Sequence, residues 1–298
     1  MKLYESPFQG LNDIIIGVPS RTPVGIMGPA AEGKTILVEE WAFKIASEIG
    51  KDVLVINTEK PNSQIYELWE LKLQNKYGKD TKIYVEEALS IEDLMKLNGF
   101  KMEIRLSQSS EDKKAKKVPI LMGVDIEKSP VRKYITEKNV GVVVYDSLTT
   151  PFNTVLIGGQ QNTPARYEVE EMFFQSIRLL FKGTECAVFT INHVSFNPQK
   201  PFLTREDIQL KGGKSILHSH EYVFYVEQAR SKYLLNKRTL WIVRHPILRE
   251  WKHRVELWLD DNGWRELTEE EIAKLKAETK AELKGEDKPE TKGDEQSG

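Results

Sequence analysis

Cysteine is almost missing from this chain of 298 residues, because Cys186 is its single thiol. One cysteine excludes a disulfide within the chain and a zinc site built from thiolates, and this usage is typical of the reducing cytoplasm. Long apolar runs are missing as well, since no stretch approaches the ~20 residues that a membrane-spanning helix needs. Residues Met1 to Gln9 also lack the pattern of a secretory signal. We therefore expect a cytoplasmic protein with no membrane partner.

A strong excess of charge is missing too, because 43 Lys and Arg residues stand against 45 Asp and Glu residues, a formal net charge of −2. Hydrophobic residues make up 40% of the chain, which suits a globular protein. We predict one core over residues 1–268, a charged helix over 269–284 and a disordered acidic tail over 285–298.

The clearest pattern in the chain is GPAAEGKT, Gly28 to Thr35, which has the G-x-x-x-x-G-K-[ST] spacing of a nucleotide-binding P-loop. An apolar run, Val24 to Met27, precedes it, and apolar residues at helical spacing follow Lys34. This order of strand, loop and helix is the context that the motif requires, and it argues against an ordinary glycine turn. The expected nucleotide-binding residues are Gly28, Pro29, Ala30, Ala31, Glu32, Gly33, Lys34 and Thr35.

The residue types in this loop suit the binding of ATP with Mg²⁺. Glycines let backbone N–H groups surround a polyphosphate, Lys34 reaches the β- and γ-phosphates, and the Thr35 hydroxyl is a magnesium ligand. Ala31 and Glu32, however, occupy positions that are glycine and a small residue in many P-loops. Glu32 also brings a negative charge toward the phosphates. We therefore expect nucleotide binding and leave the speed of hydrolysis open.

Polar residues follow three further apolar runs that predict buried parallel strands, Val53 to Ile56, Val140 to Tyr145 and Ala187 to Ile191. These polar residues are Glu59, Asp146, and Asn192 with His193. The carboxyl ends of parallel strands meet at one edge of a sheet, where ligands bind. Asp146 is in the position of a carboxylate that binds magnesium, and Glu59 in that of a base that activates water.

The remaining runs complete an α/β fold with a mostly parallel sheet flanked by helices. Three closely spaced runs predict antiparallel additions to the edge of the sheet, Tyr222 to Val226, Arg238 to Val243 and Val255 to Leu259. Met102 to Leu106 and Val118 to Met122 predict a hairpin insertion at about 100–125. Its lysine-rich turn is either solvated or a contact for a partner or nucleic acid.

These motifs resemble the RecA/RadA superfamily of ATPases from about Gly10 to Leu267. Besides the P-loop, the likeness rests on VLVINTEKP, VVVYDSLTTPF, FTINHV and GGKSILHSHEYVFYVE. Within this superfamily the chain resembles an archaeal RadA paralogue, RadB-like or KaiC-like, more than the filament-forming recombinase, because no helix-hairpin-helix module precedes the core. The resemblance implies a RecA-like core in which Glu59 is the catalytic glutamate and Asp146 the Walker B residue. It also places His193 where most members have a glutamine that senses the γ-phosphate.

The closing segment, RTLWIVRHPILREWKHRVELWLDDNGW, resembles both RadB-like and KaiC-like proteins. In KaiC-like ATPases the resemblance implies that Arg244 acts as an arginine finger in a neighbouring subunit's site, and hence a homo-oligomer. The lysine that accompanies this arginine in that family is absent, since Ile242 stands there. The basic run that follows is a solvated rim or flanks a subunit interface.

By the same resemblance, two irregular stretches, Thr149 to Arg166 and Ser195 to Lys214, correspond to DNA-binding loops. The second mixes cations for phosphates with rings on which bases can stack. The expected DNA-binding residues are Arg166, Phe196, Lys200, Phe202, Arg205 and Lys211. Alternatively, the aromatic side chains, Phe152 among them, anchor long surface loops to the body.

The leading hypothesis is a magnesium-dependent ATPase that binds single-stranded DNA and assists recombinational repair beside a main RadA-type recombinase or other repair proteins. The alternative is a nucleotide-binding regulator or scaffold with weak ATPase activity that acts through protein partners. A P-loop kinase for a small metabolite fits the closing strands less well. His218 and His220 lack further ligands at a suggestive spacing, which favours core or surface histidines over a zinc site.

Overall fold

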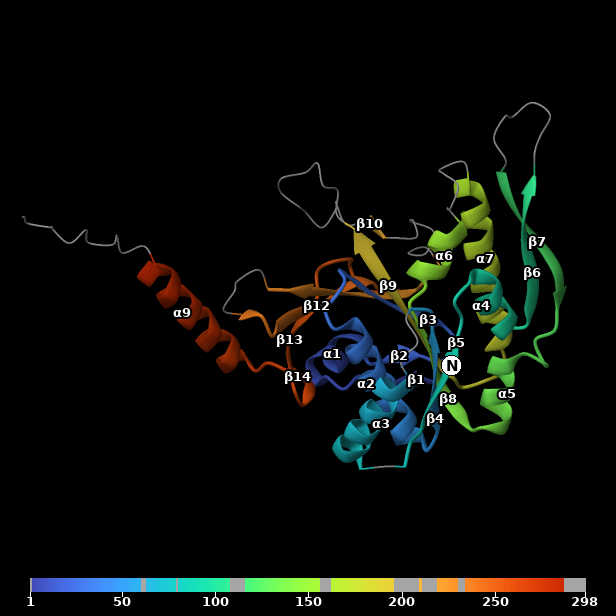
Figure 1. Ribbon diagram of the computed structural model, residues 1–298. Coiled ribbons are helices and arrows are strands. Elements are labelled where there is room, and N and C mark those ends of the chain that lie inside the picture. Colours follow the sequence, from blue (N-terminus) through green and yellow to red (C-terminus); the bar gives the residue numbers. More distant parts are fainter. Residues whose placement is uncertain are drawn as a thin grey trace, which may run out of the picture.

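One large β-sheet forms the centre of the molecule (Figure 1). The structure is a computed structural model that describes residues 2–59, 63–78, 80–107, 116–155, 162–195, 209–210, 219–229 and 234–286. Within these residues the sheet has ten strands. Their order is β14 (Gly263–Glu266), β13 (Arg254–Asp260), β12 (Lys237–Arg244), β11 (Tyr222–Gln228), β3 (Pro23–Gly28), β9 (Ala187–Ser195), β8 (Val140–Asp146), β4 (Asp52–Asn57) and β5 (Ile83–Glu87), with β10 (Gln209–Leu210) beside β9.

Neighbouring strands from β11 to β5 pair in parallel, whereas β12, β13 and β14 are antiparallel to their neighbours. This confirms the predicted α/β class with a mostly parallel sheet and antiparallel strands near the C-terminus. One part of the prediction is wrong, because β11 lies parallel to β3 and is not an antiparallel addition. A parallel neighbour requires a long crossover connection, and the chain between Ser195 and Tyr222 is long enough to provide it.

Helices cover both faces of the sheet (Figure 1). One face packs against α1 (Gln9–Ile15), α2 (Lys34–Ile49) and α3 (Ser63–Tyr77), and the other against α4 (Ile91–Leu97), α5 (Pro130–Glu137), α6 (Thr149–Val155) and α7 (Thr163–Leu180). In β4, Val53 and Val55 belong to the first core, whereas Leu54 and Ile56 belong to the second. Because both faces are buried, the central strands are continuous apolar runs without polar alternation.

The segment after β8 differs from the irregular stretch that is expected from Thr149 to Arg166. The structure has the helix α6 there, because Phe152 and Val155 lie one turn apart and are both fully buried in the second core. Phe152 also packs edge to face on Phe173 of α7, with ring centroids 5.5 Å apart. Phe152 therefore anchors this segment to the body, which is the alternative considered for the loops.

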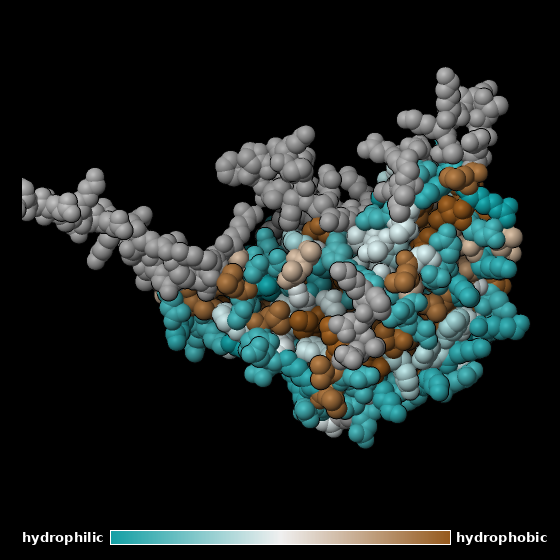
Figure 2. All heavy atoms as spheres, viewed as in Figure 1, coloured by the Kyte–Doolittle hydropathy of each residue, from teal (hydrophilic) through white to brown (hydrophobic). Residues whose placement is uncertain are grey.

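An antiparallel hairpin lies outside the main sheet, beside α4 and α7 (Figure 1). Its strands are β6 (Phe100–Ser107) and β7 (Lys116–Val124). Phe100 is buried on the inner side, whereas Leu106 and Leu121 are exposed, and Figure 2 shows apolar patches on this side of the molecule. The Lys117 Nζ donates a hydrogen bond of 2.9 Å to the carbonyl oxygen of Thr154. The hairpin is therefore attached to the end of α6.

Small elements complete the described chain. β1 (Leu3–Tyr4) pairs antiparallel with β2 (Val18–Pro19), and α9 (Glu269–Glu286) extends away from the body (Figure 1). Of the predicted acidic tail over 285–298, residues 287–298 lie outside the described residues. Over the ranges that the structure covers, no helix is long and apolar enough to cross a membrane.

Candidate nucleotide-binding site

The loop between β3 and α2 bends tightly at positions where a side chain does not fit. Gly33 has a φ of 82°, and a Cβ at this position would lie 2.8 Å from Leu259. At Gly28, an added Cβ would lie 2.7 Å from the carbonyl oxygen of Val226. Ala31 has a φ of 63°, a left-handed conformation that costs an L-residue roughly 1–2 kcal/mol. Both glycines of the motif are therefore required sterically, and Ala31 occupies a position that glycine would take without strain.

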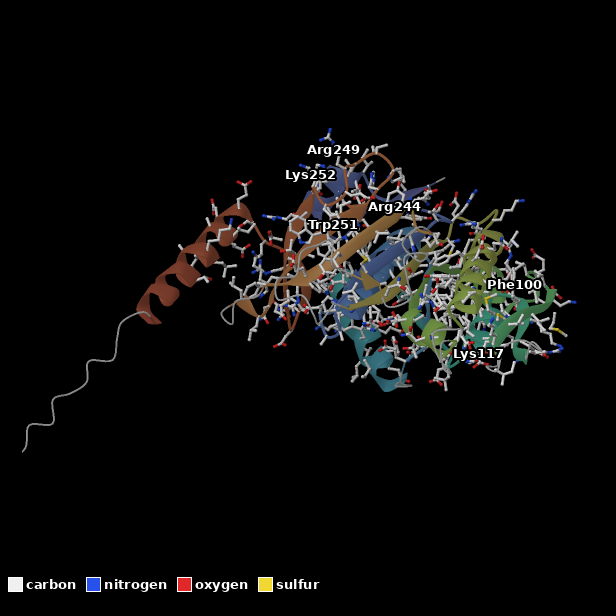
Figure 3. All side chains as sticks on the ribbon, turned by 90° about the horizontal axis from the view of Figure 1, so that it is seen from above. Phe100, Lys117, Arg244, Arg249, Trp251 and Lys252 are labelled. Atoms are coloured by element: carbon white, nitrogen blue, oxygen red, sulfur yellow. The ribbon has the colours of Figure 1, made fainter. Side chains whose placement is uncertain are left out.

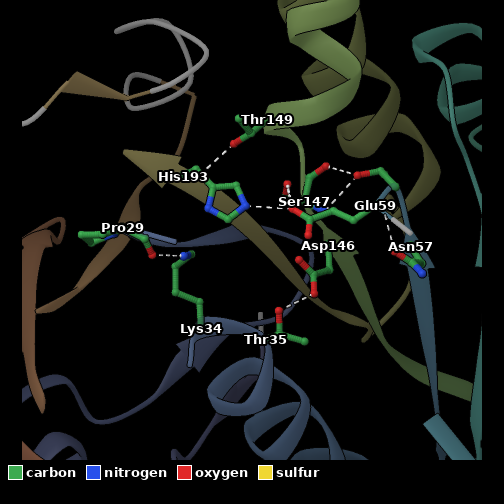
Figure 4. A network of polar contacts seen from close by, with 10 residues as sticks. Pro29, Lys34, Thr35, Asn57, Glu59, Asp146, Ser147, Thr149 and His193 are labelled. Carbon is green, nitrogen blue, oxygen red and sulfur yellow. Dashed lines mark hydrogen bonds and ion pairs between the residues drawn. The ribbon is translucent and has the colours of Figure 1, made fainter. Parts of the chain in front are cut away.

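Two charged residues of this loop have partners within the protein. Lys34 is buried, and its Nζ donates a hydrogen bond to the carbonyl oxygen of Pro29 (Figure 4). The Glu32 carboxylate lies 3.0 Å from Nε of Arg238 in β12. Burial raises the pKa of Glu32, and the charge of Arg238 lowers it in part. Glu32, which was expected to bring negative charge to the phosphates, is therefore offset by a cation beside the loop.

Thr35 and Asp146 meet at the base of the site, where α2 begins and β8 ends. The Thr35 Oγ1 donates a hydrogen bond of 2.7 Å to Oδ2 of Asp146 (Figure 4). Burial raises the pKa of Asp146 to about 6, although the hydrogen bond from Thr35 lowers it. The two residues are distant in sequence and meet because each lies at the carboxyl edge of the parallel sheet.

This pair fits a magnesium ion that is shared with a nucleotide. Mg²⁺ prefers oxygen ligands and is usually held by one or two carboxylates together with substrate phosphates. Thr35 and Asp146 offer a hydroxyl and a carboxylate of this kind. Among the residues whose placement is described, no group of three or more His, Cys, Asp or Glu could hold a metal ion by itself.

Glu59 follows β4 and contacts residues of two neighbouring strand ends. Its Oε1 lies 2.8 Å from Nε2 of His193 and accepts a hydrogen bond of 3.1 Å from Oγ of Ser147 (Figure 4). The backbone N–H of His193 donates in turn to Oγ1 of Thr149 at 2.8 Å. The hydrogen bond with His193 is the main cause that lowers the pKa of Glu59, so the carboxylate is ionised at neutral pH. The structure therefore brings Glu59, Asp146 and His193 to one edge of the sheet.

A cleft with a volume of about 1050 Å³ opens beside these residues, large enough for part of a nucleotide. From the polar groups it continues toward α3, where Ile65, Tyr66 and Trp69 line it. Glu39, one turn after Thr35 in α2, also lines the cleft and is buried. Burial, followed by the charge of Asp146, raises the pKa of Glu39.

The residues predicted to bind DNA fall into two groups. Outside the described residues lie Phe196, Lys200, Phe202, Arg205 and Lys211. Arg166 is described and belongs to α7, where its Nε lies 3.0 Å from Oε1 of Glu170. These two side chains are only 10% and 1% exposed. A buried ion pair of this kind does not face a DNA phosphate, so we correct the expectation for Arg166 to a structural role.

His220 and Arg244 lie apart from the phosphate-binding loop in sequence. His220 is buried, and its Nε2 lies 2.7 Å from Oγ1 of Thr190 in β9, which agrees with a core histidine.

Arg244 ends β12, on the same side of the molecule as Arg249 and Lys252 (Figure 3). Arg249, Lys252 and Arg254 of the basic run are exposed.

Four residues of the site were missed by the sequence prediction, Glu39, Ser147, Thr149 and Arg238. Ser147 and Thr149 come one and three residues after Asp146, so their place at a strand end was a usable signal. Arg238 pairs with a residue 206 positions away, which no local pattern indicates. In the sequence, Glu39 looks like one more polar position of an amphipathic helix.

Comparisons with known proteins agree on the type of fold. A family model described as "ATPase: KaiC" matches residues 5–200. Among solved structures, the crystal structure of the RadB recombinase is similar with a TM-score of 0.58 at 14% identity, covering 89% of this chain and 99% of that chain. At this identity the similarity shows the fold alone. The comparison with curated proteins returns no match.

Proposed function

The chain belongs to the family of KaiC ATPases, and on this premise we propose that it hydrolyses ATP to ADP and phosphate with magnesium. The observation that carries the proposal is the meeting of the P-loop, the Thr35–Asp146 pair and Glu59 at one edge of the sheet (Figure 4). These groups come from distant parts of the sequence. Each has the chemistry that phosphoryl transfer to water requires.

Nucleotide binding is assigned to the P-loop and to the start of α2. The backbone N–H groups of this loop and the positive end of the helix dipole attract phosphate oxygens. Lys34 exchanges the carbonyl oxygen of Pro29 for oxygens of the β- and γ-phosphates. Thr35 and Asp146 hold the magnesium ion, which when bound neutralises negative charge on the phosphates.

Glu59 is the proposed general base for the attacking water. Its carboxylate is ionised, is 46% exposed and lines the cleft, so a water molecule can reach it. In the proposed step, the water oxygen attacks the γ-phosphorus, its proton passes to Glu59, and the bond from that phosphorus to the β-phosphate oxygen breaks. The hydrogen bond from Ser147 holds the carboxylate in place during this transfer.

The contact between His193 and Glu59 supports control of hydrolysis by whether ATP is bound in the site. While Nε2 of His193 lies 2.8 Å from Oε1, this oxygen contacts both His193 and Ser147. We propose that His193 turns to the γ-phosphate when ATP binds and thereby releases Glu59. This contact is also the observation that favours the second candidate, a nucleotide-dependent regulator with weak ATPase activity.

We further propose that the protein binds single-stranded DNA and assists recombinational repair beside a RadA-type recombinase or other repair proteins. The support is the mixture of cations and aromatic rings in the segment Ser195 to Lys214 and the similarity of the fold to the RadB recombinase. Such binding is dominated by phosphate contacts and weakens as salt is raised.

We also propose that Arg244 reaches the site of a neighbouring copy in an oligomer.

Phosphate release from ATP, measured with magnesium and with EDTA, tests the enzymatic proposal. We expect release only with magnesium, and faster release if single-stranded DNA binds. Protein that binds ATP in a thermal-shift assay but releases no phosphate, with or without DNA, would favour the regulator. We expect the wild-type protein to bind single-stranded DNA at low salt and Lys200→Ala and Arg205→Ala to weaken this binding. No measurable DNA binding by the wild-type protein would contradict the DNA proposal.

A further inference from the structure

Glu39 is a carboxylic acid buried in the wall of the cleft. It is 5% exposed and lies one turn after Thr35 in α2. Its Oε1 atom is buried and has no hydrogen-bond partner within the described residues. Burying a carboxyl group without a partner is costly, and a buried unsatisfied polar atom therefore calls for a functional or structural reason.

The adjacent residue, Glu40, shows how this helix holds a buried carboxylate that serves the fold. Glu40 is 1% exposed, and its Oε1 accepts hydrogen bonds from Lys76 and from the hydroxyl of Tyr77. Its Oε2 accepts a hydrogen bond of 2.9 Å from the backbone N–H of Trp264. These partners come from α3 and β14. Glu39 has nearly the same burial as Glu40, but no such set of partners is seen around it in the described chain.

Glu39 lies on the side of α2 that meets Asp146. Residues four positions apart share one face of a helix, so Glu39 lies on the same face as Thr35. That face meets the end of β8, because the hydroxyl of Thr35 bonds to Asp146. Both carboxyl groups line the same cleft. Two neighbouring buried acids repel each other when ionised, and a divalent cation beside them removes this repulsion.

We propose that Glu39 is a positioning residue of the magnesium site and accepts hydrogen bonds from water bound to the ion. The inference rests on the proposed function, because the ion is the one that Thr35 and Asp146 hold with ATP. Mg²⁺ loses its waters reluctantly and keeps several of them in protein sites. Groups that orient the ligands of a metal typically change its affinity by about 10- to 100-fold when they are replaced.

Magnesium titrations of nucleotide binding test this assignment without measuring hydrolysis. Wild-type protein and Glu39→Gln are each mixed with a fluorescent ATP analogue at fixed concentration, and the magnesium concentration for half-maximal binding is recorded. Glutamine keeps the size of the side chain but not its charge. We expect this magnesium midpoint to rise about tenfold in Glu39→Gln, with the weak affinity in EDTA unchanged.

Glu40→Gln is the matched control, since it alters the next residue, a carboxylate buried to a similar degree. It is expected to lower the melting temperature, because it weakens the contacts with Lys76 and Tyr77, and to leave the magnesium midpoint unchanged. In EDTA, Glu39→Gln is expected to melt at or above the wild-type temperature. If Glu39→Gln does not fold, Glu39→Asp is used, which keeps the charge at a shorter reach and raises the midpoint by a smaller factor.

Equal magnesium midpoints for the wild-type protein and a folded Glu39 variant would overturn the inference and leave the proposed function intact. A lower melting temperature in EDTA together with an unchanged midpoint would assign Glu39 to the fold and overturn it as well. A wild-type protein that binds no nucleotide at any magnesium concentration would refute the proposed function and this inference together. The two failures are therefore distinguishable.

Discussion

The two sides of the candidate site are held in place by different kinds of interaction. On the phosphate side, the backbone from Gly28 to Gly33 is fixed sterically, and the ion pair between Glu32 and Arg238 supports it. On the acidic side, side-chain hydrogen bonds hold the half-exposed Glu59 against His193 and Ser147. Such bonds exchange partners more readily than a closely packed backbone. From this difference we propose that the phosphate side serves binding, while the acidic side changes its contacts during the reaction.

Lys34→Ala is expected to have the largest effect, because it removes the cation of the phosphate side. We expect kcat/KM for ATP hydrolysis to fall about 1000-fold, equivalent to about 4 kcal/mol. Lys44→Ala is the matched control in the same helix, since Lys44 pairs with Glu48 at 2.6 Å. Similar losses in both variants would show that the effect is not specific to the phosphate-binding lysine.

Glu32→Gln tests whether the acidic residue of the loop supports the fold or takes part in the chemistry. The variant leaves the largely buried Arg238 without its charged partner, and breaking such a pair costs about 3 kcal/mol of the free energy of unfolding. Denaturant unfolding measures this loss, and turnover by the folded fraction should be unchanged. An undiminished stability with reduced turnover would instead place Glu32 in the reaction.

Asp146→Asn tests the acidic side of the site through the pH dependence of protein stability. The pKa of Asp146 is raised from 3.8 to about 6, so the folded state binds the proton more tightly and its stability falls as the pH rises between these values. Asparagine carries no charge, and we expect the metal-free variant to be more stable than wild type by on the order of 2 kcal/mol at pH 7. This advantage should disappear near pH 4. Denaturant unfolding in EDTA at both pH values measures it, and a difference independent of pH would contradict the raised pKa.

Ala31→Gly is expected to have the smallest effect and to stabilise the protein. Glycine takes the left-handed conformation at φ 63° without strain, but it gains freedom in the unfolded chain, so the net gain is about 0.5 kcal/mol. The melting temperature of the metal-free protein measures this change. A clear decrease would mean that the methyl group of Ala31 packs usefully in the loop.

Much of the acidic side could be predicted because it follows apolar strands directly. Asp146 comes after a run that is buried on both faces, and Glu59 and His193 follow similar runs. In a parallel sheet all such ends lie at one edge, so sequence order alone brings these residues together. The two motif glycines were predictable for a similar reason, since their conformations and close contacts belong to the loop itself.

Contacts that depend on distant segments could not be predicted. Glu32 finds Arg238 only because β12 joins the sheet through β11, and the parallel placement of β11 is decided by a crossover that has no local signature. Phe152 was expected in a loop because its neighbours are polar, although burial against Phe173 fixes it in a helix. Glu39 was missed because only the tertiary structure shows that its face of α2 meets Asp146.

The role of Glu59 as the base for ATP hydrolysis is tested by measuring nucleotide binding and turnover in the same samples of wild-type protein and Glu59→Gln. Glutamine keeps the shape of the side chain but is not basic enough to take a proton from water. We expect ATP affinity within about threefold of wild type and turnover reduced about 100-fold or more. Turnover by Glu59→Gln at the wild-type rate would show that the Glu59 carboxylate is not the base.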